Sequence, residues 1–319
     1  SSTALRVGTV WACVRVFSET LGSLPFKVYR RVENGKLEDP THPLYRLIHD
    51  SPNPAMTAME FWKLAAQRIC THGNFYARIV MDEREVVRSL RPLDPSRMRV
   101  IRDPITELLV YVYTPQGGPS VPYLADEVLH IPGLGYDGED NLTGLDPIAI
   151  HAQSLGLTLD AEGYASRFFA NNANHGTWLY NPQTMTEPKK REFLTWFMDN
   201  FGGVKNSGKP AILDNGLELR SLPINHQQMQ FIETRKYQVE EICRIFRVPP
   251  HLVQDLARST NNNIEHQAID FVTHTIRPWA EMIEQRINMS LFGPREGSRY
   301  FAEFNLDSIL RGDAVSRAE

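Results

Sequence analysis

Three long stretches with helical spacing dominate the second half of the chain. They run from Asp146 to about Asn172, from Asn225 to Phe246 and from Ile264 to about Leu291. Apolar residues three or four positions apart form one stripe along a helix, and a neighbouring element must cover that stripe. The first two helices flank an insert, so the pattern favours an elongated molecule.

Prolines and a polar loop set the limits of these helices. The second helix is expected to stop at Val248-Pro249-Pro250, because proline lacks the N–H donor that a helix interior needs. The sequence ARSTNNN (257–263) then predicts a loop, and Pro278 predicts a kink in the middle of the third helix. The insert at 177–224 reads as a strand, a helix and two further strands.

Short strands and shorter helices make up the first half. Thr57 and Glu60 form a capping-box pattern that opens a helix, and Gly73 closes it. Another helix is predicted over 3–21, with an apolar stripe of Val7, Val10, Trp11, Val14, Phe17 and Leu21. Strands are expected near 74–80, 86–91, 97–102, 108–114 and 127–131, separated by proline and glycine turns. The fold class is therefore α+β.

Net charge, cysteine spacing and the lengths of apolar runs argue against several classes of protein. With a net charge of -4 the chain lacks the basic field of a protein that grips DNA tightly. Its three cysteines, Cys13, Cys70 and Cys243, show no C-x-x-C spacing, which argues against a disulfide framework or a zinc site. No run of 18 apolar residues occurs, and no basic-then-apolar leader opens the chain. We expect a soluble, reduced, intracellular protein, trimmed at both ends because it has no initiator Met and stops within a polar helical stretch.

One glycine-rich stretch resembles a nucleotide-binding loop. Gly203-x-x-x-x-Gly208-Lys209 carries most of the phosphate-cradling motif, but Pro210 stands where the magnesium-binding Ser or Thr would be. Here a helix precedes the loop and a strand follows it, the reverse of the order that brings a helix N-terminus to the phosphate. A turn is the favoured interpretation.

A second glycine pattern resembles a dinucleotide-binding loop. Gly133-x-Gly135-x-x-Gly138 follows a predicted strand, but turn-forming residues delay the next helix to about Asp146. A dinucleotide site needs its helix to begin within the glycine run, so that the helix N-terminus meets the pyrophosphate. We interpret this segment as a connector.

Two sets of side chains could hold a metal ion. Asp137, Glu139 and Asp140 form an acidic cluster, but the twelfth position of an EF-hand loop starting at Asp137 is Ile148 and not Glu. His266, Asp270 and His274 share one helix face, yet they would need outside ligands to close a site. A polar face toward solvent or another subunit is favoured. A nucleotide- or metal-dependent enzyme remains the alternative.

Eight phrases, in collinear order over essentially the whole chain, resemble the portal proteins of tailed bacteriophages, in particular those of phages with long non-contractile tails. The phrases are HPLYRLIHDSPNPAMTAMEF (42–61), HGNFYARI (72–79), LRPLDPSRMRV (90–100), DGEDNLTGLDPI (137–148), FRVPPHLV (246–253), NNIEHQAIDF (262–271), TIRPWAEMIEQRIN (275–288) and FNLDSILRGD (304–313). No single phrase is decisive. Another capsid or adaptor-like scaffold is the remaining alternative, and the loop and helix phrases argue against it.

The resemblance implies a ring of about twelve subunits at one capsid vertex. Double-stranded DNA would be packaged and later ejected through this ring, with transient and non-specific contacts. The implied partners are the terminase large subunit, a head-tail adaptor, and the major capsid and scaffold proteins, with no membrane. The family has no enzymatic activity, cofactor or metal, and its ATPase belongs to the separate terminase. The protein would assemble in the bacterial host cytoplasm and reside in the virion.

The resemblance also implies a domain layout. It assigns a wing to 1–147, stem helices to 148–176 and 225–254, a small α/β clip to 177–224 and a tunnel loop to 255–264. A long kinked helix and a strand returning to the wing would fill 265–319, and the crown that follows in the family would be missing. The DNA channel would then be lined by Arg258, Ser259, Thr260, Asn261, Asn262 and Asn263. Terminase docking would fall on the clip lysines Lys189, Lys190, Lys205 and Lys209.

The charges of the expected channel segment suit a conduit. Each retained phosphate contact would oppose sliding, because counterion-release affinity grows with the number of contacts. Acidic and basic side chains nearly balance over 225–275, and the ARSTNNN loop carries a single charge. The sequence therefore predicts a weakly gripping loop and not a catalytic one.

Overall fold

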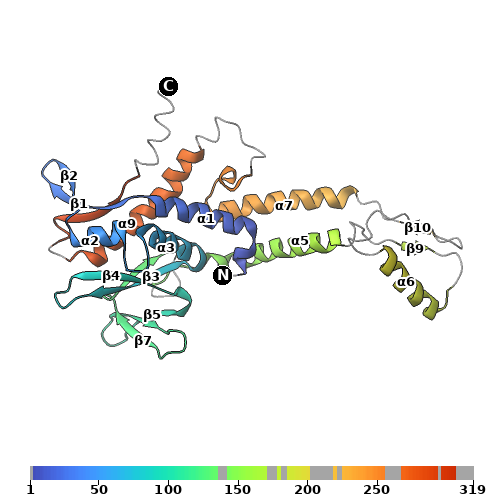
Figure 1. The fold of residues 1–319 in the computed structure, drawn as a ribbon, viewed down its shortest axis with the longest axis horizontal. Helices are drawn as coiled ribbons and strands as arrows, with labels where there is room; N and C mark the ends of the chain where they lie inside the picture. The colour runs from blue at the N-terminus through green and yellow to red at the C-terminus, as the bar shows by residue number, and fades with distance from the viewer. Residues whose placement is uncertain are drawn as a thin grey trace, which may run out of the picture. The chain divides into compact units, whose positions relative to one another are not determined.

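The computed structural model describes residues 3–135, 142–170, 178–180, 185–201, 218–220, 225–255, 267–293 and 296–306. Its helices and strands confirm the predicted mixture of α and β structure (Figure 1). Two compact units are present, one formed by Ser1–Ala152 with Glu240–Glu319 and the other by Gln153–Val239. None of the helices in the described ranges combines the length and apolar content that crossing a bilayer requires.

Two packed helices form the core of the first unit. A short turn, η1 (Ala4–Arg6), leads into α1 (Gly8–Ser23), which packs against α3 (Ala58–His72). Most of the predicted α1 stripe is buried, but Trp11 is 50% exposed and Cys13 is fully buried in its place. At this turn the buried stripe therefore includes Cys13 and not the predicted Trp11.

The predicted limits of α3 are confirmed. The Thr57 hydroxyl accepts from the Glu60 backbone N–H, and the Glu60 carboxylate accepts from the Thr57 N–H at 2.8 Å. Each bond satisfies a donor that the first helical turn leaves free. Gly73 ends the helix in the left-handed conformation (φ 71°), which glycine adopts without strain.

A three-stranded sheet joins the two ends of this unit. The central strand β1 (Phe26–Val32) pairs antiparallel with β11 (Tyr300–Phe304) on one side and β2 (Gly35–Glu38) on the other (Figure 1). The Phe26 ring stacks on Phe304 with 3.9 Å between centroids, and the edge of Trp62 contacts Phe26 at 5.1 Å. These three buried rings attach the late strand to the early core.

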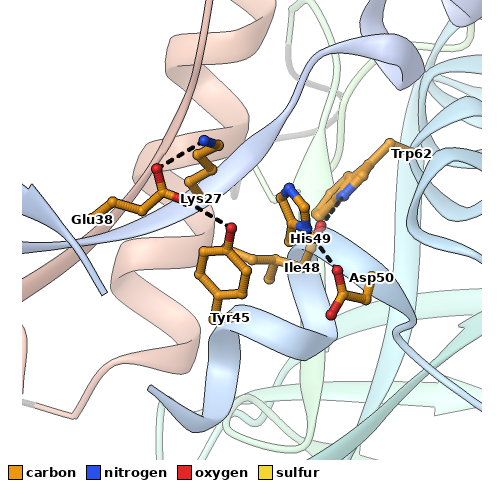
Figure 2. Close-up of polar contacts among 7 residues, drawn as sticks. All are labelled: Lys27, Glu38, Tyr45, Ile48, His49, Asp50 and Trp62. Atoms are coloured by element: carbon orange, nitrogen blue, oxygen red, sulfur yellow. Dashed lines mark hydrogen bonds and ion pairs between the residues drawn. The ribbon is translucent and has the colours of Figure 1, made fainter. Parts of the chain in front are cut away.

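Polar contacts secure the loop between β2 and α3. Figure 2 shows Glu38 accepting from the Lys27 ammonium at 2.8 Å and from the Tyr45 hydroxyl at 2.7 Å. These two bonds, that of Lys27 first, hold the pKa of Glu38 below its usual range. Tyr45 belongs to α2 (Pro43–Tyr45), which continues into the π-turn η2 (Arg46–Asp50). The Trp62 indole N–H donates to the Ile48 carbonyl at 3.0 Å, so a buried ring holds this turn to α3.

Two further antiparallel sheets complete the first half. One has the order β4-β3-β8, and the other, which follows the short turn η3 (Pro95–Arg97), has the order β5-β6-β7. The predicted strands match the observed ones within one or two residues, but β7 was not predicted. The strands are β3 (Asn74–Met81), β4 (Val87–Leu93), β5 (Met98–Arg102), β6 (Leu109–Tyr113), β7 (Val121–Leu124) and β8 (Val128–Pro132).

The first predicted long helix is divided in two. Asp146 accepts from the backbone N–H groups of Ile148 and Ala149 and opens α4 (Pro147–Ile150). The helix is interrupted at His151, and α5 runs over Ala152–Ala170. The second unit also contains α6 (Glu187–Phe201) and a small antiparallel pair formed by β9 (Trp178–Tyr180) and β10 (Glu218–Arg220). The second long helix, α7 (Asn225–Phe246), has the predicted limits.

The third predicted helix departs from regular geometry before its proline and not at it. Helical residues 267–271 lead into the π-turn η6 (Val272–Ile276), and α9 (Arg277–Leu291) follows with Pro278 in its first turn. In a continuous α-helix the Pro278 ring would clash with the carbonyl of His274, four residues earlier. The irregularity therefore lies at the π-turn 272–276, and the predicted position at Pro278 is wrong.

Glu284 on α9 makes stability depend on pH. Its carboxylate accepts from the Phe304 N–H at 2.8 Å, yet burial raises its pKa to about 7, with Glu303 and Glu281 adding to the rise. The folded state therefore binds this proton more tightly than the unfolded state, and the contribution to stability falls as pH rises from about 4.5 to about 7.

We predict that Glu284→Gln gains stability relative to the wild type as pH increases. Gln keeps an acceptor for the Phe304 amide but has no charge to bury, so the gain between pH 5 and pH 8 should be about 1 kcal/mol after solvent screening. Urea unfolding of both proteins at both pH values measures it. An unchanged difference between the two proteins would show that Glu284 does not titrate in this range.

Candidate functional site

The C-terminal end of α7 leads into a turn that precedes the segment predicted as the tunnel loop. Arg247 leaves the helix with φ 50°, and the Val248 N–H donates back to the Cys243 carbonyl at 3.0 Å. Two prolines then prevent further helix, and the chain closes into η5 (Pro250–Val253). The left-handed Gln254 (φ 67°) ends this turn.

Side-chain hydrogen bonds connect residues 247–251, at and after the end of α7, to the helical residues 267–275. His251 Nδ1 lies 2.8 Å from Gln267 Oε1, and the Thr275 hydroxyl donates to the Arg247 carbonyl at 2.8 Å. Because an amide oxygen only accepts, His251 must carry its proton on Nδ1. The turn after α7 and the helical residues from 267 onward are thereby joined by two side-chain hydrogen bonds.

A pocket of about 530 Å³ lies between residues 240–255 and residues 267–275. It is lined by three acidic side chains, Glu240, Asp255 and Asp270, and by the cations Arg244 and Arg247 together with His274. Arg244 also pairs with Glu241, outside the lining. Opposite charges are therefore interleaved around the pocket, as the sequence predicted for this stretch, and no net field favours a polyanion.

Cys243, which lines this pocket, contacts a second cysteine. Cys13 of α1 and Cys243 of α7 are both buried, with 3.9 Å between their sulfur atoms, and both are free thiols. The contact with Cys243 and burial raise the pKa of the Cys13 thiol, so this thiol stays protonated. No sequence pattern indicated this contact, because the two residues are 230 positions apart.

The predicted channel and clip residues are only partly within the described structure. Arg258 to Asn263 lie outside the described residues, as do Lys205 and Lys209. Lys189 and Lys190 lie on the exposed surface of α6, where Lys190 pairs with Glu187 at 2.8 Å. Both lysines belong to a solvated helix face, and Lys189 forms no ion pair with a described residue.

The Gly133-x-Gly135 stretch is a tight backbone junction. The Gly133 N–H donates to the Gly73 carbonyl at 2.6 Å, and a Cβ on Gly133 would lie 2.7 Å from that oxygen. Gly144 also packs against Gly73, and a Cβ there would lie 2.3 Å from the same carbonyl. Glycine is required here for close approach between chain segments, which supports the connector interpretation. Gly138 and the acidic cluster at 137–140 lie outside the described residues.

A buried polar network completes this junction. Asn74 donates to the Gly144 carbonyl and accepts from the Gly144 N–H, both at 2.8 Å. His130 Nε2 lies 3.0 Å from the Asn74 amide oxygen, and the Tyr111 hydroxyl lies 3.3 Å from His130 Nδ1. Burial lowers the pKa of His130 to about 3, so the ring is neutral and can donate from Nε2 while accepting at Nδ1. No sequence motif pointed to this network.

The other candidate ligand sets fall partly or wholly outside the described residues. Asp270 and His274 both line the 530 Å³ pocket and are exposed, while His266 lies outside the described residues. Within the described ranges, no group of three or more His, Cys, Asp or Glu side chains is placed to hold a metal ion. The nucleotide-like stretch from Gly203 to Lys209 is also outside the described residues.

Comparison with known proteins gives a consistent family. The family model described as phage portal protein matches residues 8–319. The portal protein of Enterobacteria phage HK97 is 34% identical over 319 residues, covering 98% of this chain and 74% of that protein. The probable portal protein of Streptomyces phage phiC31 is 33% identical, covering 99% of this chain and 70% of that protein.

The fold has solved counterparts at lower sequence identity. A chain in the neck of a native gene transfer agent particle, computed with C12 symmetry, aligns with a TM-score of 0.67 and 22% identity. The alignment covers 99% of this chain and 88% of that chain. The likeness extends over the whole chain and includes both of its units.

Proposed function

Because this chain belongs to the phage portal protein family, we propose that it assembles into a ring of about twelve copies at one capsid vertex and forms the DNA channel there. The observation that carries the proposal is the 34% identity to the HK97 portal protein over nearly the whole chain. The C12 symmetry of the gene transfer agent neck, whose chain shares this fold, supports the number of subunits.

The proposed layout assigns each part of the ring subunit to one region. The wing comprises 1–147, the stem helices 148–176 and 225–254, the clip 177–224 and the tunnel loop 255–264, with 265–319 returning to the wing. The unbroken length of α7 and the separate small β9–β10 pair support the stem and clip assignments.

The tunnel loop is proposed to contact DNA without holding it. Its residues Arg258 to Asn263 offer one guanidinium, two hydroxyls and three amides. The bonds between His251 and Gln267 and between Thr275 and Arg247 would anchor its two ends while DNA passes. The mixed charges around the adjoining pocket support a weak grip, because each net phosphate contact adds to the affinity and opposes sliding.

The chain is proposed to form the channel for a packaging motor but not to hydrolyse nucleotide itself. Hydrolysis of nucleotide would belong to the terminase large subunit, which would dock on the clip through Lys189, Lys190, Lys205 and Lys209. A head-tail adaptor, major capsid protein and scaffold protein would be the other partners. The ring would assemble in the host cytoplasm, remain in the virion and need no cofactor.

Charge reversal tests the docking part of this proposal. Lys189→Glu combined with Lys205→Glu and Lys209→Glu should lower DNA packaging about tenfold, because like charges would then face an acidic partner. DNase-protected DNA in a packaging reaction measures the effect, and electron microscopy checks that rings still form. The matched control is Arg46→Glu, an exposed charge reversal on η2. Normal packaging by the triple variant would show that these three lysines do not take part in terminase docking.

A further inference from the structure

The outer face of the sheet β5-β6-β7 carries two unlike rows of side chains. Strand pairing aligns Arg99, Val112 and Pro122 in one row and Ile101, Val110 and Leu124 in the next. Cross-strand partners project from the same side of a sheet, so both rows lie on one face. This face is therefore apolar over most of its area and basic at one corner.

This face is open, whereas the opposite face is covered. On the covered face Tyr111 is buried against Tyr76 and Val128, with Met98, Val100, Leu109 and Tyr123 packed around them. On the open face Leu124 is 52% exposed and Ile101 is 36% exposed. In the turn between β5 and β6, Ile105 is 90% and Leu108 59% exposed, beside the acids Asp103 and Glu107. Contiguous exposed apolar side chains usually mark an interaction site.

A groove of about 840 Å³ adjoins the basic corner. Its lining includes Arg97, Arg99, Val112, Thr114, Gln116 and Ser120, and none of its ten described lining residues is acidic. Arg99 forms no ion pair with any described residue. Arg97 shares a single carboxylate, that of Asp94, with Arg68, and each guanidinium lies 3.7 Å from it. The corner thus has more positive charge than its own neighbours neutralise.

We propose that this face, defined by the two rows and the adjoining groove, binds an amphipathic protein segment with apolar side chains along one stripe and carboxylates at its edge. The apolar stripe would cover Ile101, Val110 and Leu124, and the carboxylates would pair with Arg97 and Arg99, whose guanidinium forks match them. Nucleic acid fits less well, because phosphates gain nothing from the apolar rows. A face-to-face pair of copies would leave the arginines unmatched, since neither the two rows nor the described groove lining contains an acid.

A peptide titration tests this inference independently of ring formation. The probe is a fluorescein-labelled 16-residue helical peptide with Leu at i, i+3, i+4 and i+7 positions and Glu at the flanking ones. We expect the full chain to bind it with Kd on the order of 10 µM by fluorescence anisotropy. Arg99→Glu and Leu124→Asp should each weaken binding about tenfold or more. Arg46→Glu and Met289→Asp change exposed residues elsewhere and should leave Kd within about twofold.

Three outcomes would overturn the inference. The first is equal binding of a scrambled peptide of the same composition, which would mean that no amphipathic stripe is recognised. The second is tighter binding of a DNA duplex that depends on Arg99 but not on Leu124, which would assign the face to nucleic acid. The third is loss of self-association by Leu124→Asp in analytical ultracentrifugation, which would assign the face to a second copy.

Discussion

Gly73→Ala is expected to destabilise the fold by about 4 kcal/mol or more, enough to remove most soluble native protein. A Cβ at this position would lie 2.0 Å from the Leu145 carbonyl oxygen and 2.5 Å from its carbon, both backbone atoms that cannot rotate away. The residue also has φ 71°, where a side chain adds strain. Three chain segments meet here, so relief of the clash requires separating β3 from the segment that enters α4.

A second glycine, Gly117, separates the steric cost of the added Cβ from the cost of its positive φ. Gly117 has nearly the same φ, 75°, but a Cβ there would meet nothing within 4 Å. Gly117→Ala should therefore cost only about 1 kcal/mol, the conformational part of the effect. Urea unfolding curves and soluble yield of both variants provide the comparison. Equal losses for the two alanines would show that close packing at Gly73 contributes nothing.

If the proposed tunnel loop lies on the DNA path, arginine substitutions in it are expected to slow DNA passage strongly. Changing Asn261, Asn262 and Asn263 to Arg adds three cations per subunit, and a ring multiplies that number. Because affinity for phosphates rises with the number of cations that contact them, packaging should fall tenfold or more at low salt and recover partly at high salt. The matched control replaces the same three residues with Gln, which keeps amides and adds no charge.

Two measurements separate an effect on DNA translocation from an effect on ring formation. Packaged DNA length over time measures translocation, and electron microscopy of the same particles measures ring formation. Normal packaging by the arginine variant at low salt would show that these residues do not face the DNA path. Equal defects in the arginine and glutamine variants would show that loop shape matters and charge does not.

Local patterns predicted much of the fold because their causes are local. The capping box at Thr57 and Glu60, the left-handed Gly73 and the limits of α7 all follow from neighbouring residues, and all three are confirmed. Strand β7 was missed because Pro122 breaks the strand pattern, although proline is tolerated on an edge strand such as this one. The shift of the third helix to a π-turn was missed because proline predicts a disturbance but not its exact place.

Non-local contacts could not be predicted from one sequence. The Cys13–Cys243 contact joins residues 230 positions apart, and the Asn74–Gly144 bonds join residues 70 apart. Neither pair belongs to a motif, so only the folded chain brings them together. Gly133 did belong to a recognisable glycine pattern, which was interpreted as a connector, but its contact with the Gly73 carbonyl, and that of Gly144, were visible only in the folded chain.

Cryo-electron microscopy of capsids assembled in cells that express the protein tests most directly whether this chain forms the portal ring. We predict density for a twelvefold ring at one vertex, with mass spectrometry of the particles giving about twelve copies of the chain per capsid. A protein that remains monomeric when purified and is absent from assembled capsids would contradict the proposed function.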